Sequence, residues 1–94
     1  MATITEEKQN EIIDCMVDYL PILRDKTGIS QEALSKLIGI SRQTYVGIES
    51  GKKRMSWKTC LALLFFFSYN SRTSNFIVEK NIFTNELIDI INLK

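Results

Sequence analysis

The chain has 94 residues, a length typical of one small domain, and its net charge of +1 does not by itself indicate a nucleic-acid binder. It contains no histidine and two isolated cysteines, Cys15 and Cys60. The sequence therefore lacks the commonest general base and the four ligands of a structural zinc. It also shows no nucleophile–base pair and no glycine-rich phosphate loop. We expect no catalytic residues, no metal, no cofactor and no enzymatic activity.

The apolar segments are short. The longest run, residues 60–67, falls well below the roughly 20 residues that a membrane helix needs. The N-terminus is acidic and lacks the basic start of a signal peptide. We therefore expect a cytoplasmic protein with no membrane partner, in which both cysteines are buried thiols.

The charge is unevenly distributed along the chain. Residues 1–23 carry one lysine against five carboxylates, a net charge of −4. Residues 24–58 carry eight lysines or arginines against three carboxylates, a net charge of +5, and residues 59–94 carry three of each. The positive charge is thus concentrated in the middle third, as expected for a local nucleic-acid footprint.

The first predicted element is a helix over about residues 6–26. Thr5 is a suitable N-cap, and apolar residues then recur at helical spacing. Pro21 interrupts this pattern, so we expect the helix to bend or break at 19–21. Gly28 is expected to end it in a left-handed conformation.

Two short helices follow. Ser30 caps the first, Gly39 ends it, and Ser41 caps the second, which runs to about residue 50 before Gly51. The inner face of the first of these helices is predicted to consist of Ala33, Leu34, Leu37 and Ile38.

Ser56 caps a fourth helix over about 56–68, whose inward residues are predicted to be Trp57, Leu61, Leu64 and Phe65. Asn70 or Ser71 caps a short helix that reaches Lys80, although residues 75–78 are the one stretch that could form a strand. Asn81 tolerates a left-handed C-cap. Thr84 caps a last helix to about Asn92, which places on one face Leu87, Ile88 and Ile91.

Residues 31–49 have the layout of a helix-turn-helix. Two helices of about eight residues are joined by a short turn that contains Gly39. When Tyr45 and Ile48 face inward, Gln43 points outward and Arg42 flanks it. Exposed planar polar side chains at the start of a helix are what a recognition helix in the major groove needs.

This segment resembles the Xre-type helix-turn-helix family of Cro and phage repressors. The resemblance covers about residues 20–67 and rests on Leu23-Arg24, Gly28-Ile29-Ser30-Gln31, Leu34, residues 38–44, Ile48-Glu49 and Gly51-Lys52. It implies a lambda-repressor-like, all-α bundle of four to five helices with a short helical C-terminal extension. We expect a DNA-binding domain over 1–68, with its motif at about 30–50, and an extension over 69–94 that belongs to the same domain.

Three positions depart from the family pattern. Ser35 replaces a usual alanine, and Tyr45 replaces a usual isoleucine or valine. Gly47 stands where relatives often have a base-contacting side chain, which predicts a shorter direct readout.

The resemblance also implies roles for individual residues. Base contacts are assigned to Arg42, Gln43 and Thr44. Phosphate contacts are assigned to Gln31, Ser41, Lys52, Lys53 and Arg54. Gln31 would also brace the first residue of the recognition helix, and Arg24 and Glu49 would form a structural ion pair.

Elementary chemistry agrees with these roles. Glutamine pairs with adenine and arginine with guanine through two hydrogen bonds each, whereas lysine and arginine neutralise phosphates. The structural alternatives are solvated surface residues at 42–43, an ordinary solvated turn at 52–54 and a simple helix start at Gln31. Within this motif we favour the DNA contacts.

The tail has more apolar residues than two short helices can bury on one face. We therefore predict a homodimer on a palindromic operator, formed by the fourth helix and the tail with Phe76, Phe83, Leu87 and Ile91 at its interface. The alternative is a monomer whose tail completes its own core. For function, the leading prediction is a sequence-specific transcriptional repressor bound to double-stranded DNA. The second is a protein-interaction module, such as the antitoxin of a toxin–antitoxin pair.

Overall fold

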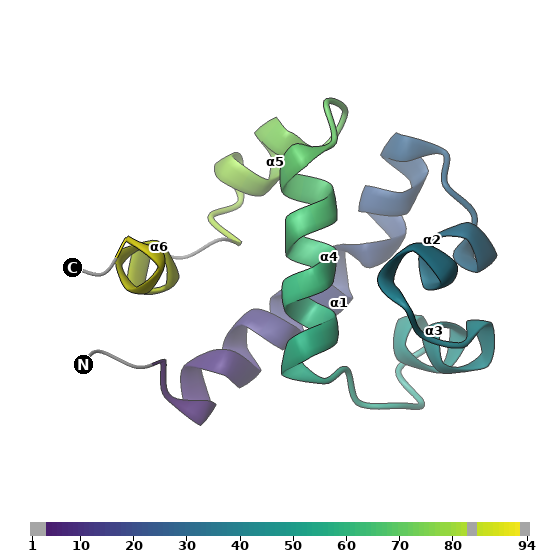
Figure 1. Ribbon diagram of the computed structural model, residues 1–94, viewed down its shortest axis with the longest axis horizontal. Helices are drawn as coiled ribbons and strands as arrows, with labels where there is room; N and C mark the ends of the chain where they lie inside the picture. The colour runs from purple at the N-terminus through teal and green to yellow at the C-terminus, as the bar shows by residue number, and fades with distance from the viewer. Residues whose placement is uncertain (1–3, 83–84, 93–94) are drawn as a thin grey trace.

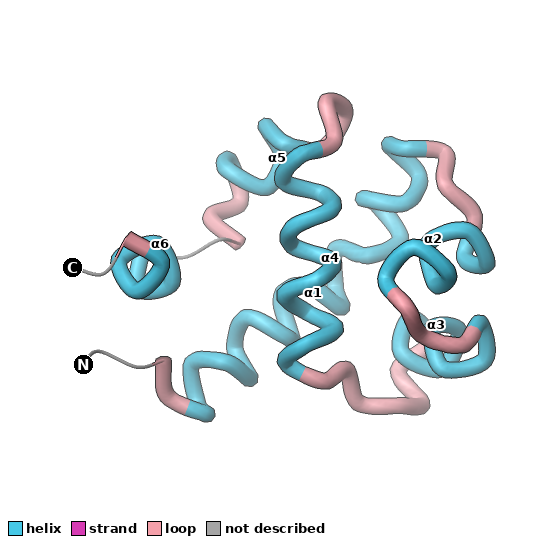
Figure 2. The backbone as a smooth tube through the Cα atoms, viewed as in Figure 1, coloured by secondary structure: helices cyan, strands magenta, loops and turns pink. Residues whose placement is uncertain are grey.

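The computed structural model describes residues 4–82 and 85–92, and every regular element in this part of the chain is a helix. The six helices are α1 (Glu6–Thr27), α2 (Gln31–Ile38), α3 (Arg42–Glu49), α4 (Trp57–Tyr69), α5 (Ser74–Glu79) and α6 (Asn85–Ile91). Figure 2 shows the first five of them joined by loops. The all-α prediction is confirmed, and the segment 75–78 that could have been a strand lies within α5.

The predicted caps of the first four helices are present. The side chains of Thr5, Ser30, Ser41 and Ser56 each accept a hydrogen bond from the backbone N–H three residues later, at 3.0–3.1 Å. These bonds satisfy amides that the helix itself leaves without a partner. Gly28 ends α1 with a φ of 74°, a left-handed conformation that a residue with a side chain rarely adopts.

α1 continues unbroken through Pro21. A proline inside a helix removes one backbone hydrogen bond and crowds the preceding turn, which usually bends the axis. Figure 1 shows the two halves of α1 running in different directions. Of the two outcomes expected at 19–21, a bend or a break, the helix therefore has the bend.

The core lies mainly between α1 and α4, which pack together at the centre of the molecule (Figure 1). Our prediction for the inner face of α4 was wrong in part. Leu64 is buried as predicted, but Leu61 and Phe65 are exposed, and the other buried positions are Cys60, Leu63 and Phe67. Because residues 60–67 are all apolar, the sequence offers no polar contrast that would fix the buried face.

α2 buries fewer apolar residues than predicted. Leu34 and Ser35 are buried and Ile38 is half-buried, but Ala33 is exposed and Leu37 is 59% exposed. The small Ser35 side chain lies at 1% exposure in the core. Leu37, near the C-terminal end of α2, instead adds to the apolar surface of the molecule.

The tail contributes to the core of its own chain. Ile77, Ile82 and Leu87 are buried, and Asn81 has the predicted left-handed conformation, with a φ of 50°. α5 begins later than predicted, at Ser74, and Asn70 instead accepts a hydrogen bond from the backbone N–H of Arg72. Thr84, the predicted cap of the last helix, lies outside the described residues. None of the helices described combines the length and apolarity required to cross a membrane.

Candidate nucleic-acid interface

The exposed side chains at the start of α3 form the first part of the candidate site. Tyr45 and Ile48 are buried and fix α3 to the core, so Arg42 and Gln43 lie on its exposed face. Thr44 is half-buried, and its hydroxyl accepts a hydrogen bond from the Ser41 hydroxyl at 2.8 Å. Ser41 also accepts from the Thr44 backbone N–H. Its side chain is thus engaged in capping, and a phosphate contact at this point would use the free amides of the first helical turn.

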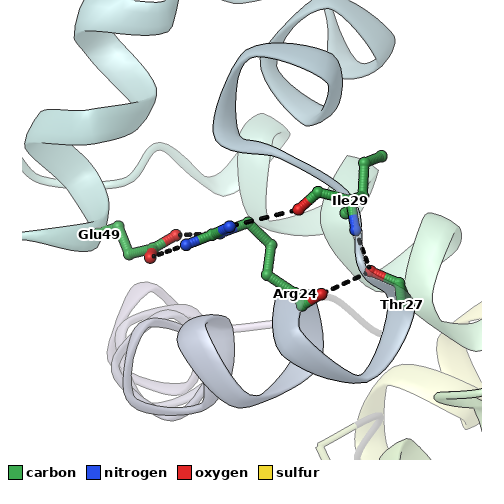
Figure 3. Close-up of polar contacts among 4 residues, drawn as sticks. All are labelled: Arg24, Thr27, Ile29 and Glu49. Carbon is green, nitrogen blue, oxygen red and sulfur yellow. Dashed lines mark hydrogen bonds and ion pairs between the residues drawn. The ribbon is translucent and has the colours of Figure 1, made fainter.

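The orientation of α3 is secured by an ion pair with α1. Arg24 donates from Nε to Glu49 Oε2 at 3.0 Å and from Nη2 to Glu49 Oε1 at 2.9 Å, as Figure 3 shows. The Arg24 guanidinium also donates to the Ile29 carbonyl at 3.3 Å, in the loop before α2. Thr27 strengthens the same corner, because its hydroxyl donates to the Arg24 carbonyl and accepts from the Ile29 N–H. One guanidinium therefore ties the end of α1 to α3 and to the loop before α2.

The surroundings of this pair favour its charged form. Burial is the largest single influence on the pKa of Glu49 and would raise it, but the hydrogen bonds and the positive charge around the carboxylate, those of Arg24 first, together outweigh burial and the pKa is lowered. The hydrogen bond with Glu49 raises the pKa of Arg24. The Tyr45 hydroxyl is buried beside the pair, and its burial raises the pKa of that group. Gln31 is a smaller cause of the lowered pKa of Glu49, and the predicted roles of Gln31 at a phosphate and at the first residue of α3 stay predictions.

The turn after α3 is held against the helix by Gly47. The backbone N–H groups of Lys52 and Lys53 donate to the Gly47 carbonyl at 2.9 and 3.0 Å, and the Ser50 hydroxyl donates to it at 3.1 Å. A Cβ atom built at Gly47 would lie 3.2 Å from the Cβ of Lys53. The resemblance to the family gave no reason for a glycine at this position. The structure gives one, because the glycine lets the basic turn lie close against α3.

The three basic residues of this turn have different surroundings. Lys52 and Lys53 are exposed. Arg54 instead donates to Asp14 Oδ1 at 2.6 Å and to Asn10 Oδ1 at 2.8 Å, both on α1. The predicted phosphate contact of Arg54 stays a prediction, and in the structure its exposed guanidinium is paired with α1. Asp14 and Arg54 are 40 positions apart in the sequence, and no local sequence pattern predicts that they pair.

The predicted dimer residues of the tail are mostly used inside the chain. Leu87 is buried, at 5% exposure, which corrects its assignment to an intermolecular surface. Phe76 packs edge-on against Tyr19, with ring centroids 5.2 Å apart, and Lys26 lies over its ring. Ile91 is exposed, and Phe83 lies outside the described residues.

The cysteines provide no reactive site. Cys60 is buried, and this burial raises its pKa to about 12. Cys15 is only half-buried, against our expectation, and burial again raises its pKa. Both groups are therefore thiols at neutral pH. Within residues 4–82 and 85–92, no group of three or more potential ligands could hold a metal ion.

With this geometry established, comparison with known proteins assigns the motif. Residues 22–64 match the protein-family model described as helix-turn-helix. This segment, which spans α2, α3 and parts of α1 and α4, is therefore a helix-turn-helix of the Xre and Cro type. That family consists of DNA-binding regulators that are generally not enzymes. No curated protein and no solved structure matched the chain.

Proposed function

We propose that the protein is a sequence-specific transcriptional repressor that places α3 in the major groove of its operator. The observation that carries this proposal is the exposure of Arg42 and Gln43 at the start of a helix fastened by the Arg24–Glu49 pair. A fixed helix presents these side chains to base edges with little loss of conformational freedom on binding. Repression is the simplest regulatory outcome, because it requires only that the bound protein occupy the DNA.

Sequence recognition and general affinity come from different residues in this proposal. Gln43 can form two hydrogen bonds with adenine and Arg42 two with guanine, and each such pair discriminates between bases by roughly 1–3 kcal/mol. Thr44 contributes a smaller contact, because its hydroxyl already interacts with Ser41. Lys52 and Lys53, on the turn beside α3, supply the salt-dependent attraction to phosphates that is independent of sequence.

The test is a selection of bound duplexes from a random pool, followed by titration of the selected site and a scrambled one. Gln43→Ala should reduce the preference for the selected site by roughly 5- to 100-fold, since a base-specific pair is lost. Lys53→Ala should weaken binding to both duplexes alike and flatten the salt dependence by about one unit. Lys80→Ala, which removes the same charge from the end of α5, should leave both properties unchanged.

Equally weak binding of the wild-type protein to every duplex would overturn the proposal. So would a Gln43→Ala variant that retains the full sequence preference. A palindromic selected site is expected if two copies bind together, as closed two-fold symmetry would require.

A protein-interaction module, such as an antitoxin, is the second candidate function. The observation in its favour is the exposed apolar surface that includes Leu37, Phe65 and Tyr69, since large apolar patches mark interaction sites. Recovery of a different protein on immobilised wild type but not on Phe65→Ser, together with no duplex preference in the selection, would favour this candidate over the repressor.

A further inference from the structure

A ridge of three apolar side chains lies uncovered along α4. Leu61, Phe65 and Tyr69 are spaced four residues apart, and their exposed fractions are 38%, 67% and 80%. The rings of Phe65 and Tyr69 contact each other, with centroids 5.0 Å apart. Such spacing places all three side chains on one face of the helix.

An apolar groove lies beside this ridge, between α2 and α4. It has a volume of about 500 Å³ and is lined by Leu37, Ile38, Ala62, Phe65, Phe66, Tyr69 and Asn70. None of these residues is charged, and Asn70 alone has a polar side chain group other than the tyrosine hydroxyl. A charged ligand would therefore find no partner in the groove, whereas an apolar helix ridge would fit its chemistry.

We propose that a second copy of this chain covers the groove, with the ridge of each copy inserted into the groove of the other. A surface that carries both a ridge and a matching groove can pair with itself about a two-fold axis, as symmetric dimers do. Rows of side chains four residues apart are also those that interdigitate in the commonest class of helix pair.

The exposed area is sufficient for such a dimer. From ordinary side-chain areas, the exposed parts of Leu37, Leu61, Phe65 and Tyr69 amount to about 450 Å² per copy. Burying them on both copies would remove about 900 Å² from water before any neighbouring residue is counted, close to the roughly 1,000 Å² that a biological interface needs. The net charge of +1 per chain gives little repulsion between copies.

The ridge lies away from the basic turn along α4. Phe65 lies eight residues after Trp57, the first residue of α4, or about 12 Å along the helix axis. Lys52 and Lys53 precede that first residue. Leu61, the ridge residue nearest to the turn, lies four residues after Trp57, so a partner seated on the ridge contacts α4 beyond its first turn and leaves the basic turn accessible. This interface shares α4 with the one predicted from the sequence, but it adds α2 and uses neither Phe76 nor Leu87 of the tail.

The test is sedimentation equilibrium of the full chain without DNA, at roughly 1 to 100 µM, a range that shifts an associating system by mass action. The wild type should dimerise reversibly. Phe65→Ser should raise the dissociation constant at least about 30-fold, the effect of losing a central aromatic contact. Val78→Ser is the matched control, since Val78 is 79% exposed on α5, outside the groove, and it should change the constant less than about twofold.

Leu37→Ser, on the opposite wall of the groove, provides a second variant that changes α2 and leaves the sequence of α4 intact. Circular dichroism melting should show that both variants stay folded, because both side chains are more than half exposed. A wild type that stays monomeric at the highest concentration overturns the proposal, as does a dimer that tolerates both groove variants. An equal loss with Val78→Ser overturns it too. Because no DNA is present, the result does not depend on the proposed repressor function.

Discussion

Two points along α1 are joined to α3 and to the turn after it by ion pairs of the same chemical kind in different surroundings. Near the C-terminal end of α1, Arg24 meets Glu49 through two parallel hydrogen bonds, and the Glu49 side chain is only 10% exposed. In its N-terminal half, Asp14 meets Arg54 with both side chains more than half exposed. The first pair is shielded from water, whereas the second remains screened by solvent and salt.

This difference separates a structural contact from an adjustable one. Removing one member of a shielded pair leaves a charge without water or a partner, which is costly. An exposed pair is worth about 1 kcal/mol or less and can exchange its partner for another charge. We therefore expect Arg24–Glu49 to determine the stability and orientation of α3. We expect Asp14 to determine how readily Arg54 becomes available to a phosphate.

The largest effect is expected from Arg24→Ala. The change leaves the half-buried Glu49 carboxylate without its ion-pair partner. It also removes the hydrogen bond to the Ile29 carbonyl. It should lower the free energy of unfolding by about 2–3 kcal/mol, between the values for fully buried and exposed pairs. Urea unfolding measures this. Lys36→Ala is the control, because its ion pair with Glu32 is exposed, and a comparable loss in that variant would contradict the distinction.

A related effect should appear in the pH dependence of stability. The pKa of Glu49 is lower in the folded chain than its ordinary value of 4.5. The carboxylate therefore stabilises the fold above that value, and this contribution is lost as the pH falls through the lower folded pKa. Glu49→Gln should be less stable than wild type at pH 7, and the gap should narrow as the pH approaches about 3. Urea unfolding at a series of pH values measures it, and a gap that stays constant would contradict the assigned cause.

The smallest effect is expected from Asp14→Asn, and it should appear in DNA binding rather than in stability. Releasing Arg54 should raise affinity about two- to fivefold at about 0.1 M salt, the magnitude of an exposed ion pair. The salt dependence should steepen by about one unit, because one more cation can reach a phosphate. Fluorescence anisotropy at several salt concentrations measures both quantities.

Glu11→Gln is the matched control for that variant. It removes one carboxylate from the same helix, but Glu11 pairs with Lys8 rather than with Arg54. An equal gain in affinity from both variants would show that overall charge, and not the release of Arg54, is responsible.

The sequence predicted best those features that depend on neighbouring residues. A serine or threonine cap needs only the amide three residues later, and a left-handed turn needs only its glycine, so the positions of the first four helices could be derived from sequence. The buried face of α4 could not, because residues 60–67 contain no polar residue to mark the exposed side. The choice among Leu61, Leu63 and Phe65 is made by packing against α1.

The candidate site shows the same division. The exposure of Arg42 and Gln43 follows from helical geometry once Tyr45 and Ile48 are buried. The pairing of Arg24 with Glu49 was available only through resemblance to a family, since the two residues are 25 positions apart. Neither helical geometry nor resemblance to a family indicated the Asp14–Arg54 contact. Exposed charges at long separation are brought together by the tertiary fold, and no periodicity records them.

The carbonyl of Gly47 has a consequence for the thermodynamics of DNA binding. Because it accepts hydrogen bonds from the amides of Lys52 and Lys53, the basic turn is already ordered before any DNA arrives. The heat-capacity change of association should then reflect the surface buried at the interface, without the larger contribution that accompanies folding on binding. In the proposed complex the turn would act as a preorganised element, with its conformational entropy already lost when the domain folds.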